Sequence, residues 1–498
     1  VFTSDRFNVL KDHGAHVQRP LWASTSTKNP AYRDVIYVEE LIAPDSVNTV
    51  PPATLEAFLE HGVVEITIRK DLDQANDVFT MLEARGIKMQ QVTDELEEEG
   101  VKAFSDAYST LLESVEQRRI SAVEEIAPIK EVVQEKLAAL KQTGYTRRLF
   151  EKDPSLWTED LKGQEEIRIR MDWLETPYKE IEMISHYTGL GRKLRDKGFT
   201  NAALLGMGGS SLAPEVMCRI LKARSVGSAD ELSLTVLDST DPLQVIATTD
   251  NSPAKKTVYI VASKSGTTGE INAFFDHFWK RTEGVVSENP GNHFVTVTDP
   301  GTRLAELGKE KGFWGVYQAD PRVGGRNSAL TAFGLVPAAI MGLDLRKILE
   351  NAVDMADLCA AERPAEANPG VMLGTILGSA ALHGRNKVTF LTEGAWVSFG
   401  DWLEQLIAES SGKDGKGILP VTNEPEMDPE NYSSDRFFVY FEKNGERIEK
   451  IEALKAAGHP VISLHIAKDE DLPGQFYLWE IAVATACSII GVNSFDQP

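Results

Sequence analysis

Cysteine is scarce in this chain, with three residues among 498. Cys218, Cys359 and Cys487 lie far apart, and no CxxC pair occurs. The odd number and wide spacing indicate neither a disulfide framework nor a thiolate metal site, and they favour a reducing compartment. The nine histidines are scattered as well. His13 and His16, the closest pair, have no carboxylate or thiol cluster beside them, so we expect no metal site.

Long apolar runs and excess positive charge are also missing. The longest apolar run, at 330–343, contains Pro337 and is shorter than the roughly 20 residues that a membrane helix needs. The formal net charge of −23 argues against nucleic acid or an anionic membrane as a partner. A small anionic substrate stays possible, because a local pocket can oppose the sign of the whole molecule.

The composition predicts a globular protein, with 42% hydrophobic and 26% charged residues. At roughly 100–200 residues per domain, the length allows three or four domains. The first 125 residues alternate between predicted strands and helices. We expect strands at 19–25, 35–44 and 64–70, and a helix at 51–62, which begins with proline and ends at a glycine. Long, charged helices follow at 95–150.

Short apolar runs rich in β-branched residues recur from residue 165 onward, with helical stretches between them. These predicted strands lie at 202–206, 234–238, 258–263 and 293–299, and then at 387–393, 437–442 and 460–466. Such spacing predicts βαβ units, and hence an α/β fold with two doubly wound parallel-sheet subdomains. We place a barrel-like piece at 1–125, a helical connector at 126–164, and the two subdomains at 165–345 and 346–498.

The stretch "LLGMGGSSLAPE" (204–215) ends a predicted strand and begins a helix. A dinucleotide fingerprint has G-x-G-x-x-G/A at such a turn, with an acidic residue near the end of the next strand. Gly206, Gly208 and Asp238 fit that pattern, but Ser211 stands at the sixth position. A phosphate seat at a helix N terminus explains the same residues, and so does a plain glycine turn.

The turn "SKSGTTGE" (263–270) favours the phosphate seat. Ser263, Ser265, Thr267 and Thr268 place four hydroxyl groups at the end of a predicted parallel strand, where open α/β sheets bind their ligands. A simple cap or turn would need one hydroxyl group. Two anion-binding turns on nearby strands therefore indicate one compact phosphorylated ligand.

At this point the motifs resemble a known family. "GMGGSSLAPE" and "ASKSGTTGE" are similar to the sugar-phosphate loops of phosphoglucose isomerases. "GGRNSALTAFGL" (324–335), "ESSGKDGKG" (409–417) and "GVNSFDQP" (491–498) resemble three further motifs of that family, in the same order. The resemblance covers 165–498 and implies sugar-isomerase subdomains.

Aldose–ketose isomerisation moves a proton between adjacent carbons through a cis-enediol. It needs a carboxylate base, a cation near the developing oxyanion and an anchor for the phosphate, and it requires no cofactor. The resemblance implies that Glu409 is the base, that Arg326 stabilises the enediolate, and that Gln405, on the same helix face as Glu409, contacts substrate. A solvated Glu409 and a structural Arg326 are the alternatives.

The resemblance also implies a substrate wall, to which Lys264 contributes mainly its backbone. The implied contacts are Gly209, Ser210, Ser263, Lys264, Ser265, Thr268 and Gln497. The family carries a lysine a few residues beyond the "FDQ" motif, where this sequence stops at Pro498. Its ring-opening histidine has no assigned counterpart, and His465 lies only in the corresponding region.

Residues 19–58 resemble the last two βα units of a transaldolase barrel. Ser24 and Lys28 are the nearest matches to residues that hold the sugar phosphate in that family. The Schiff-base lysine belongs to an earlier strand that this sequence lacks, and a few βα units cannot close an eightfold barrel. We therefore expect a fragment of a fusion protein, lacking an N-terminal part and a C-terminal tail, with transaldolase activity only in the intact fusion.

The expected function is the cytoplasmic interconversion of glucose 6-phosphate and fructose 6-phosphate, by a chain fused to a truncated transaldolase. The family is commonly dimeric, and mannose 6-phosphate stays open as a second substrate. One rival is a non-catalytic sugar-phosphate-binding protein of the same fold, which would need no base. The other is a Rossmann oxidoreductase, which Ser211 and the "SKSGTT" turn disfavour.

Overall fold

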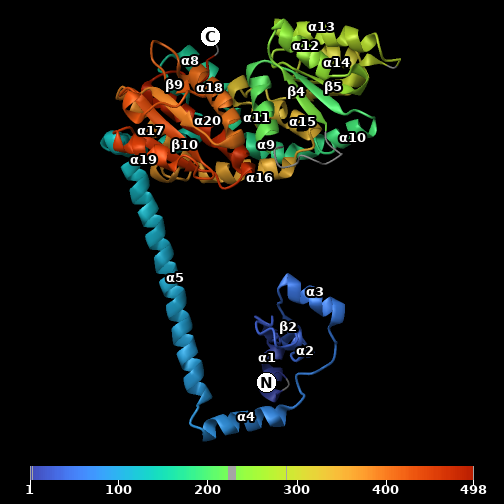
Figure 1. Cartoon of the computed structure of the whole chain (residues 1–498), viewed down its shortest axis with the longest axis vertical. Helices are drawn as coiled ribbons and strands as arrows, with labels where there is room; N and C mark the ends of the chain where they lie inside the picture. The colour runs from blue at the N-terminus through green and yellow to red at the C-terminus, as the bar shows by residue number, and fades with distance from the viewer. Residues whose placement is uncertain (1, 3, 222–231, 288, 497–498) are drawn as a thin grey trace. The chain divides into compact units, whose positions relative to one another are not determined.

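The computed structural model describes residues 2, 4–221, 232–287 and 289–496 (Figure 1). The chain divides into two compact units, Val1–Val115 and Glu116–Pro498. Each unit is described by itself. The expected four-part division at 125, 164 and 345 stays a prediction. Within the described ranges, no helix is both long and apolar enough to span a membrane.

The N-terminal unit is mostly helical, with one pair of parallel two-residue strands. Its elements are α1 (Asp5–Asp12), β1 (Leu21–Trp22), α2 (Ile36–Glu39), β2 (Val47–Asn48), α3 (Pro52–His61), α4 (Leu72–Ala84) and the first part of α5 (Met89–Glu125). The helix predicted at 51–62 and the long helix after 95 are confirmed.

Two of the strands predicted in this unit are wrong. Residues 36–39 form the short helix α2, whose last residue, Glu39, accepts a hydrogen bond from the Val63 N–H at 2.8 Å and pairs with Arg33 at 2.9 Å. Residues 64–70 form no strand, because the N–H groups of Thr67 and Ile68 both donate to one carbonyl oxygen instead of forming a ladder. Local polar contacts therefore overrode the β propensity of these segments.

Large apolar side chains of this unit are exposed. Leu59 is 77% exposed, Val64 79% and Phe104 82%. A closed (β/α)8 barrel buries such side chains between eight strands and an outer ring of helices. The two short strands among the described residues of this unit cannot provide that core.

The second unit begins with helices and then forms two parallel sheets. The leading helices are α6 (Lys130–Gln142), α7 (Tyr145–Phe150), α8 (Leu161–Arg168), α9 (Thr176–Met183) and α10 (Leu190–Asp196). The first sheet has the order β4-β3-β5-β6-β7. Its strands are β3 (Asn201–Leu205), β4 (Ser233–Leu237), β5 (Thr257–Ala262), β6 (Phe294–Thr298) and β7 (Gly315–Gln318), and all the pairings are parallel.

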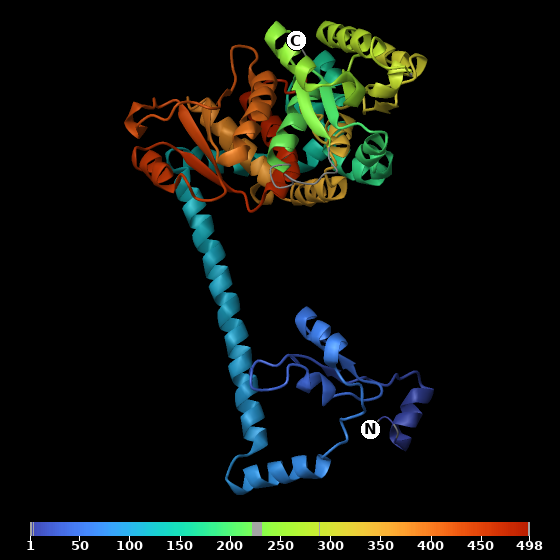
Figure 2. The ribbon, with the colours of Figure 1, turned by 45° about the vertical axis from the view of Figure 1, so that its right-hand side comes forward.

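Helices cover both faces of this five-stranded sheet, as the two views show (Figures 1 and 2). The helices in this part of the chain are α11 (Leu212–Leu221), α12 (Pro242–Asn251), α13 (Gly269–Glu283), α14 (Arg303–Glu310), α15 (Ala332–Ile340) and α16 (Leu345–Leu358). Ala202 and Leu204 of β3 belong to the large central core, whereas Ala203 and Leu205 pack with α13 and α14 on the other face. Such two-sided burial explains the continuous apolar strands of the sequence.

The second sheet has the order β11-β10-β8-β9 and is also parallel. It is built from β8 (Lys387–Leu391), β9 (Leu419–Val421), β10 (Arg436–Glu442) and β11 (Val461–His465), with α17 (Pro369–Leu382), α18 (Val397–Ser411), α19 (Ile448–Ala456) and α20 (Leu472–Ile490). All seven strands predicted after residue 165 are confirmed. The sequence missed β7 and β9, which are short and carry Gly315 and Pro420.

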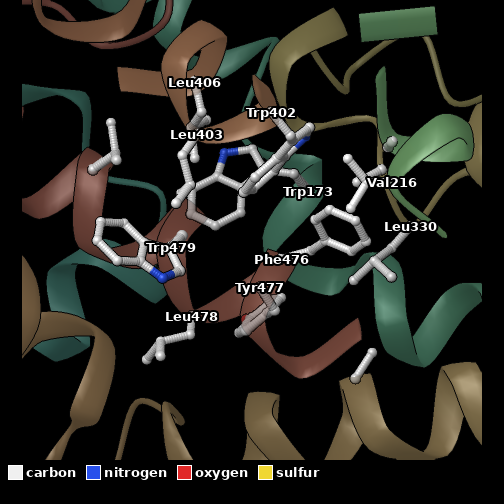
Figure 3. Close-up of a cluster of buried hydrophobic side chains, with 14 of the residues drawn as sticks. Trp173, Val216, Leu330, Trp402, Leu403, Leu406, Phe476, Tyr477, Leu478 and Trp479 are labelled. Carbon is white, nitrogen blue, oxygen red and sulfur yellow. The ribbon is translucent and has the colours of Figure 1, made fainter. Parts of the chain in front are cut away.

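Helix α20 lies at the centre of the second unit and is buried on all sides. Its ring of Phe476 meets Trp402 of α18 edge-on, with centroids 4.7 Å apart. Figure 3 shows Trp402, Leu403 and Leu406 of α18 in the same cluster as Phe476 and Trp479. These apolar side chains hold α18 against α20.

Glu480 of α20 is a carboxylic acid in this core. It is 2% exposed, its Oε1 has no hydrogen-bond partner among the described residues, and burial raises the pKa of Glu480 well above its usual 4.5. The folded state therefore binds this proton more tightly than the unfolded state does, and stability falls as pH rises above 4.5.

We predict that the stability of the Glu480→Gln variant, relative to that of the parent protein, increases when the pH is raised from 5 to 8. The amide cannot ionise, so the variant avoids the cost that the acid incurs at higher pH. Urea unfolding at both pH values measures the difference, with the exposed Glu449→Gln as the control. An equal stability difference at both pH values would contradict the buried neutral acid.

Candidate active site

The candidate site lies where the connections from the first sheet diverge. The chain leaves β3 for its neighbour β4 on one side and returns to β5 on the other side. Ligands of open α/β sheets bind at such a switch point, outside the carboxyl ends of the strands. The loops after β3 and β5 contain the two predicted anion-binding turns, 206–211 and 263–268.

A cavity of about 480 Å³ opens beside these loops. Six residues predicted for the substrate wall line this one cavity, namely Gly209, Ser210, Ser263, Lys264, Ser265 and Thr268. Arg170 and Gly324–Gly325 line it from other segments of the chain. The structure therefore brings the predicted wall residues together, while their roles stay predictions.

The hydroxyl groups of the second loop shape the turn itself. Ser263 Oγ lies 2.9 Å from Thr268 Oγ1 and accepts the Gly266 N–H at 3.1 Å. Ser265 Oγ accepts the Thr267 N–H at 3.2 Å. Thr268 is the N-cap of α13, yet its side chain caps no N–H group. Among the described residues, no side chain accepts the first N–H groups of this helix, which favours an anion there.

The Lys264 side chain is already paired. Its Nζ lies 2.9 Å and 2.7 Å from the two carboxylate oxygens of Asp299 and 3.4 Å from the Asp320 carbonyl oxygen. Burial raises the pKa of Asp299, and the Lys264 charge opposes that shift. This geometry agrees with a backbone contribution of Lys264 to the wall.

Gly208 and Gly209 allow the first loop to contact two other segments. A Cβ atom at Gly209 would lie 2.2 Å from the Gly325 carbonyl oxygen, and one at Gly208 would lie 2.7 Å from Gln405 Nε2. Gly208 also has φ of 53°, which disfavours side chains. The absence of side chains at these two glycines therefore lets this loop pack closely against the Gly325 turn and α18.

Gln405 and Glu409 occupy one face of α18, as predicted. Gln405 Nε2 donates to Glu409 Oε1 at 3.0 Å, and the other carboxylate oxygen lies 3.5 Å from Arg326 Nε. The Glu409 side chain is 53% exposed. Both of its oxygens are thus oriented by neighbours, while solvent still reaches the group.

Arg326 is almost completely buried, at 8% exposure. Its Nη1 donates to Ser410 Oγ and to the Ser494 carbonyl oxygen, each at 3.2 Å, and its Nη2 donates to the Asp496 carbonyl oxygen at 2.5 Å. Burial lowers the pKa of Arg326, and the Glu409 charge opposes the shift. Arg326 therefore combines a structural role with a contact to the candidate base.

The sequence reasoning missed two cations at this site. Lys413 Nζ donates to the Asn493 carbonyl oxygen at 2.7 Å and pairs with the Asp496 carboxylate, and burial lowers the pKa of Lys413. Arg170 lines the cavity, and its buried Nε has no hydrogen-bond partner within the described part of the chain. Lys413 belongs to the ESSGKDGKG motif (409–417), so the sequence carried a signal for it. No local sequence pattern indicated Arg170.

The remaining predicted residues are Gln497, His465, Ser24 and Lys28. Gln497 falls outside the described residues. His465 ends β11, is 61% exposed, and has its Nδ1 4.0 Å from Glu442. Ser24 and Lys28 are exposed residues of the N-terminal unit, and Ser24 has a φ of 57°. Their proposed contacts with a sugar phosphate stay predictions.

The fold and the cavity define an α/β protein of the sugar-isomerase type. A hypothetical protein of Thermus thermophilus has a similar structure, with a TM-score of 0.62 and 21% identity over 76% of this chain and 95% of that one. A glucose-6-phosphate isomerase from Chlamydia trachomatis gives 0.51 and 17%, over 76% and 82%. At these identities the likeness concerns the fold alone.

Two families match the chain itself. The transaldolase/fructose-6-phosphate aldolase family matches residues 3–115, and the phosphoglucose isomerase family matches residues 185–418. The chain thus joins a piece that matches transaldolases to a domain that matches phosphoglucose isomerases.

Curated relatives match the N-terminal part. The transaldolase of Frankia alni is 49% identical over 118 residues, which are 24% of this chain and 32% of that protein. The transaldolase of Mycolicibacterium smegmatis is 48% identical over 117 residues, 23% and 32% respectively. The chain spans about a third of the length of these relatives.

We predict that Gly209→Ala destabilises the protein by roughly 1–3 kcal/mol, because its Cβ would overlap the Gly325 backbone. Gly325→Ala changes the other side of the same contact, but its Cβ would meet nothing within 4 Å. Urea unfolding of both variants measures the effect. Equal stability of the two variants would argue against a close approach of the loops at Gly209.

Proposed function

We propose that the second unit interconverts glucose 6-phosphate and fructose 6-phosphate through a cis-enediol. The observation that carries this proposal is the contact of Glu409 with Arg326 and Gln405, beside a cavity walled by the hydroxyl turn. The phosphoglucose isomerase match and the sugar-isomerase fold support it. In this proposal, side chains of the second unit alone carry out the isomerisation.

The phosphate of the substrate would bind at the hydroxyl turn. Ser265 and Thr268 line the cavity at the N terminus of α13, where hydroxyl and backbone N–H groups favour an anion. Arg170 would satisfy its unpartnered Nε with a phosphate oxygen, since a buried guanidinium group without an acceptor is costly. Gly209 and Ser210 would close the wall around the sugar.

Glu409 would move the proton. Its carboxylate takes the proton from C2 of the open-chain aldose, the C–H electron pair forms the C1=C2 bond, and the carbonyl oxygen becomes an oxyanion. Arg326, a permanent cation, would stabilise that charge. The proton of the C2 hydroxyl group would pass to O1, and Glu409 would return its proton to C1 as the C2–O bond becomes the ketose carbonyl. Gln405 orients the carboxylate at 3.0 Å, and Gln497 is proposed as a further substrate contact.

A binding protein without catalysis is the second candidate. It would need the hydroxyl turn but no oriented carboxylate, so the paired oxygens of Glu409 favour the enzyme. A dinucleotide site is less well supported, because Ser211 is fully buried and its hydroxyl group donates to the Gly208 carbonyl oxygen at 3.1 Å. The N-terminal domain piece, with Ser24 and Lys28, is proposed to serve transaldolase chemistry only as part of a complete barrel.

We predict that Glu409→Gln lowers the isomerisation rate about 10²- to 10⁴-fold, since the amide cannot accept the proton. A coupled assay of fructose 6-phosphate conversion by the full-length protein measures the loss. Glu404→Gln, an exposed change on the same helix, is the control and should leave the rate unchanged. Sugar-phosphate binding with no turnover in either the parent or Glu404→Gln would select the binding protein.

For the phosphate end, Thr268→Ala and Arg170→Gln should each raise KM for fructose 6-phosphate about tenfold, with a smaller change in kcat. Each change removes a donor from the phosphate and leaves the base in place. Arg168→Gln, which removes an exposed arginine two residues away, should not change KM. If all three variants have the KM of the parent protein, the phosphate binds elsewhere.

A further inference from the structure

A second cavity, of about 390 Å³, lies in the same unit and shares no lining residue with the first. Its wall comes from α10 with the residues before it, from the end of α15, and from the start of α16. Ala339 and Gly342 of this wall follow the Gly325 turn of the first cavity through the buried helix α15. The two cavities therefore lie near opposite ends of one short stretch of chain.

Three arginines line this second cavity: Arg192, Arg195 and Arg346. Of the described residues in its wall, Asp344 alone is acidic. The Asp344 carboxylate is already engaged, because its Oδ1 accepts the Lys347 N–H at 3.2 Å and its Oδ2 lies 3.7 Å from Lys347 Nζ. A wall of this charge is unusual in a chain with a net charge of −23.

Within the described part of the chain, Arg346 is the one of these three arginines that has an ion pair with an acidic side chain. Arg346 Nη1 lies 3.8 Å from Glu350, but both side chains are more than half exposed, so this pair is screened by solvent. Arg195 differs from the other two arginines. Its Nη1 is buried and has no hydrogen-bond partner in the described ranges.

The shape of the cavity depends on close backbone packing. A Cβ atom at Gly191 would lie 2.6 Å from the Ala339 carbonyl oxygen, so α10 lies directly against the end of α15. This contact holds Arg192 and Arg195, which follow on α10, over the cavity. The N terminus of α16, a helix of 14 residues, adds its partial positive charge.

We propose that this second cavity binds a small phosphorylated metabolite at a site separate from the active site. Guanidinium groups bind phosphate oxygens through paired, charge-assisted hydrogen bonds, and a phosphate oxygen would satisfy the buried Nη1 of Arg195. Three arginines against one engaged carboxylate favour a ligand with more than one negative charge.

Pyrophosphate titration of the full-length protein by calorimetry tests this proposal. The parent protein should show two classes of sites, and Arg195→Gln should weaken one class about tenfold or more. Thr268→Ala should weaken only the other class, so the failure of one site is distinguishable from the failure of the other. Lys193→Gln removes a charge from the same helix outside the cavity and should change neither.

Arginine modification gives a readout that needs no variant. Phenylglyoxal labelling followed by peptide mass spectrometry should show that pyrophosphate protects Arg192 and Arg195 in the parent protein. A single class of sites that Arg195→Gln leaves unchanged would overturn the proposal, and so would unchanged labelling of both arginines. If the parent protein has two classes of pyrophosphate sites but no isomerase activity, the proposed function is overturned and this inference stands.

Discussion

The close packing of α17 against α20 is the contact on which the second unit depends. Gly370, Gly374 and Gly378 form a stripe along α17, and Cβ atoms there would lie 2.5 Å, 2.3 Å and 2.9 Å from atoms of α20. With no side chain on α17 at these positions, Ile481, Ile489 and the Ala482 carbonyl oxygen of α20 pack directly against it. Helix α20 is buried on all sides because α16, α17 and α18 surround it. Both parallel sheets pack around this one central core.

Contacts with this core determine where the residues of the candidate site lie. The aromatic contact of Trp402 with Phe476 holds α18 and thereby places Glu409. The segment after α20 supplies the carbonyl oxygens of Ser494 and Asp496 to Arg326. Hydrogen bonds from Trp157 to the Ala484 carbonyl oxygen and from Tyr477 to the Leu174 carbonyl oxygen tie the segment containing Arg170 to the same helix. One buried helix thus positions residues that are far apart in sequence.

The sequence predicted the parallel strands because each is a short apolar run, and the central strands β3, β5, β6, β8 and β10 are buried on both faces. It also predicted the wall residues of the cavity, since hydroxyl groups and glycines cluster in local motifs. It did not predict the purpose of Gly208 and Gly209, which depends on Gly325 and Gln405 across the fold. Arg170 and the arginine cavity were missed for the same reason, because their partners are distant in sequence. The strands expected at 35–44 and 64–70 failed where local polar contacts decided the backbone.

The central claim is that the hydroxyl turn and Glu409 face the two ends of one ligand. A crystal structure of the full-length protein with a phosphorylated sugar acid that mimics the enediolate tests it most directly. The account predicts the phosphate at Ser265 and Thr268, and the carboxylate of the mimic within about 3 Å of Glu409 or Arg326, as proton transfer requires. A ligand bound in the reverse orientation, or with its sugar end away from Glu409, would contradict it.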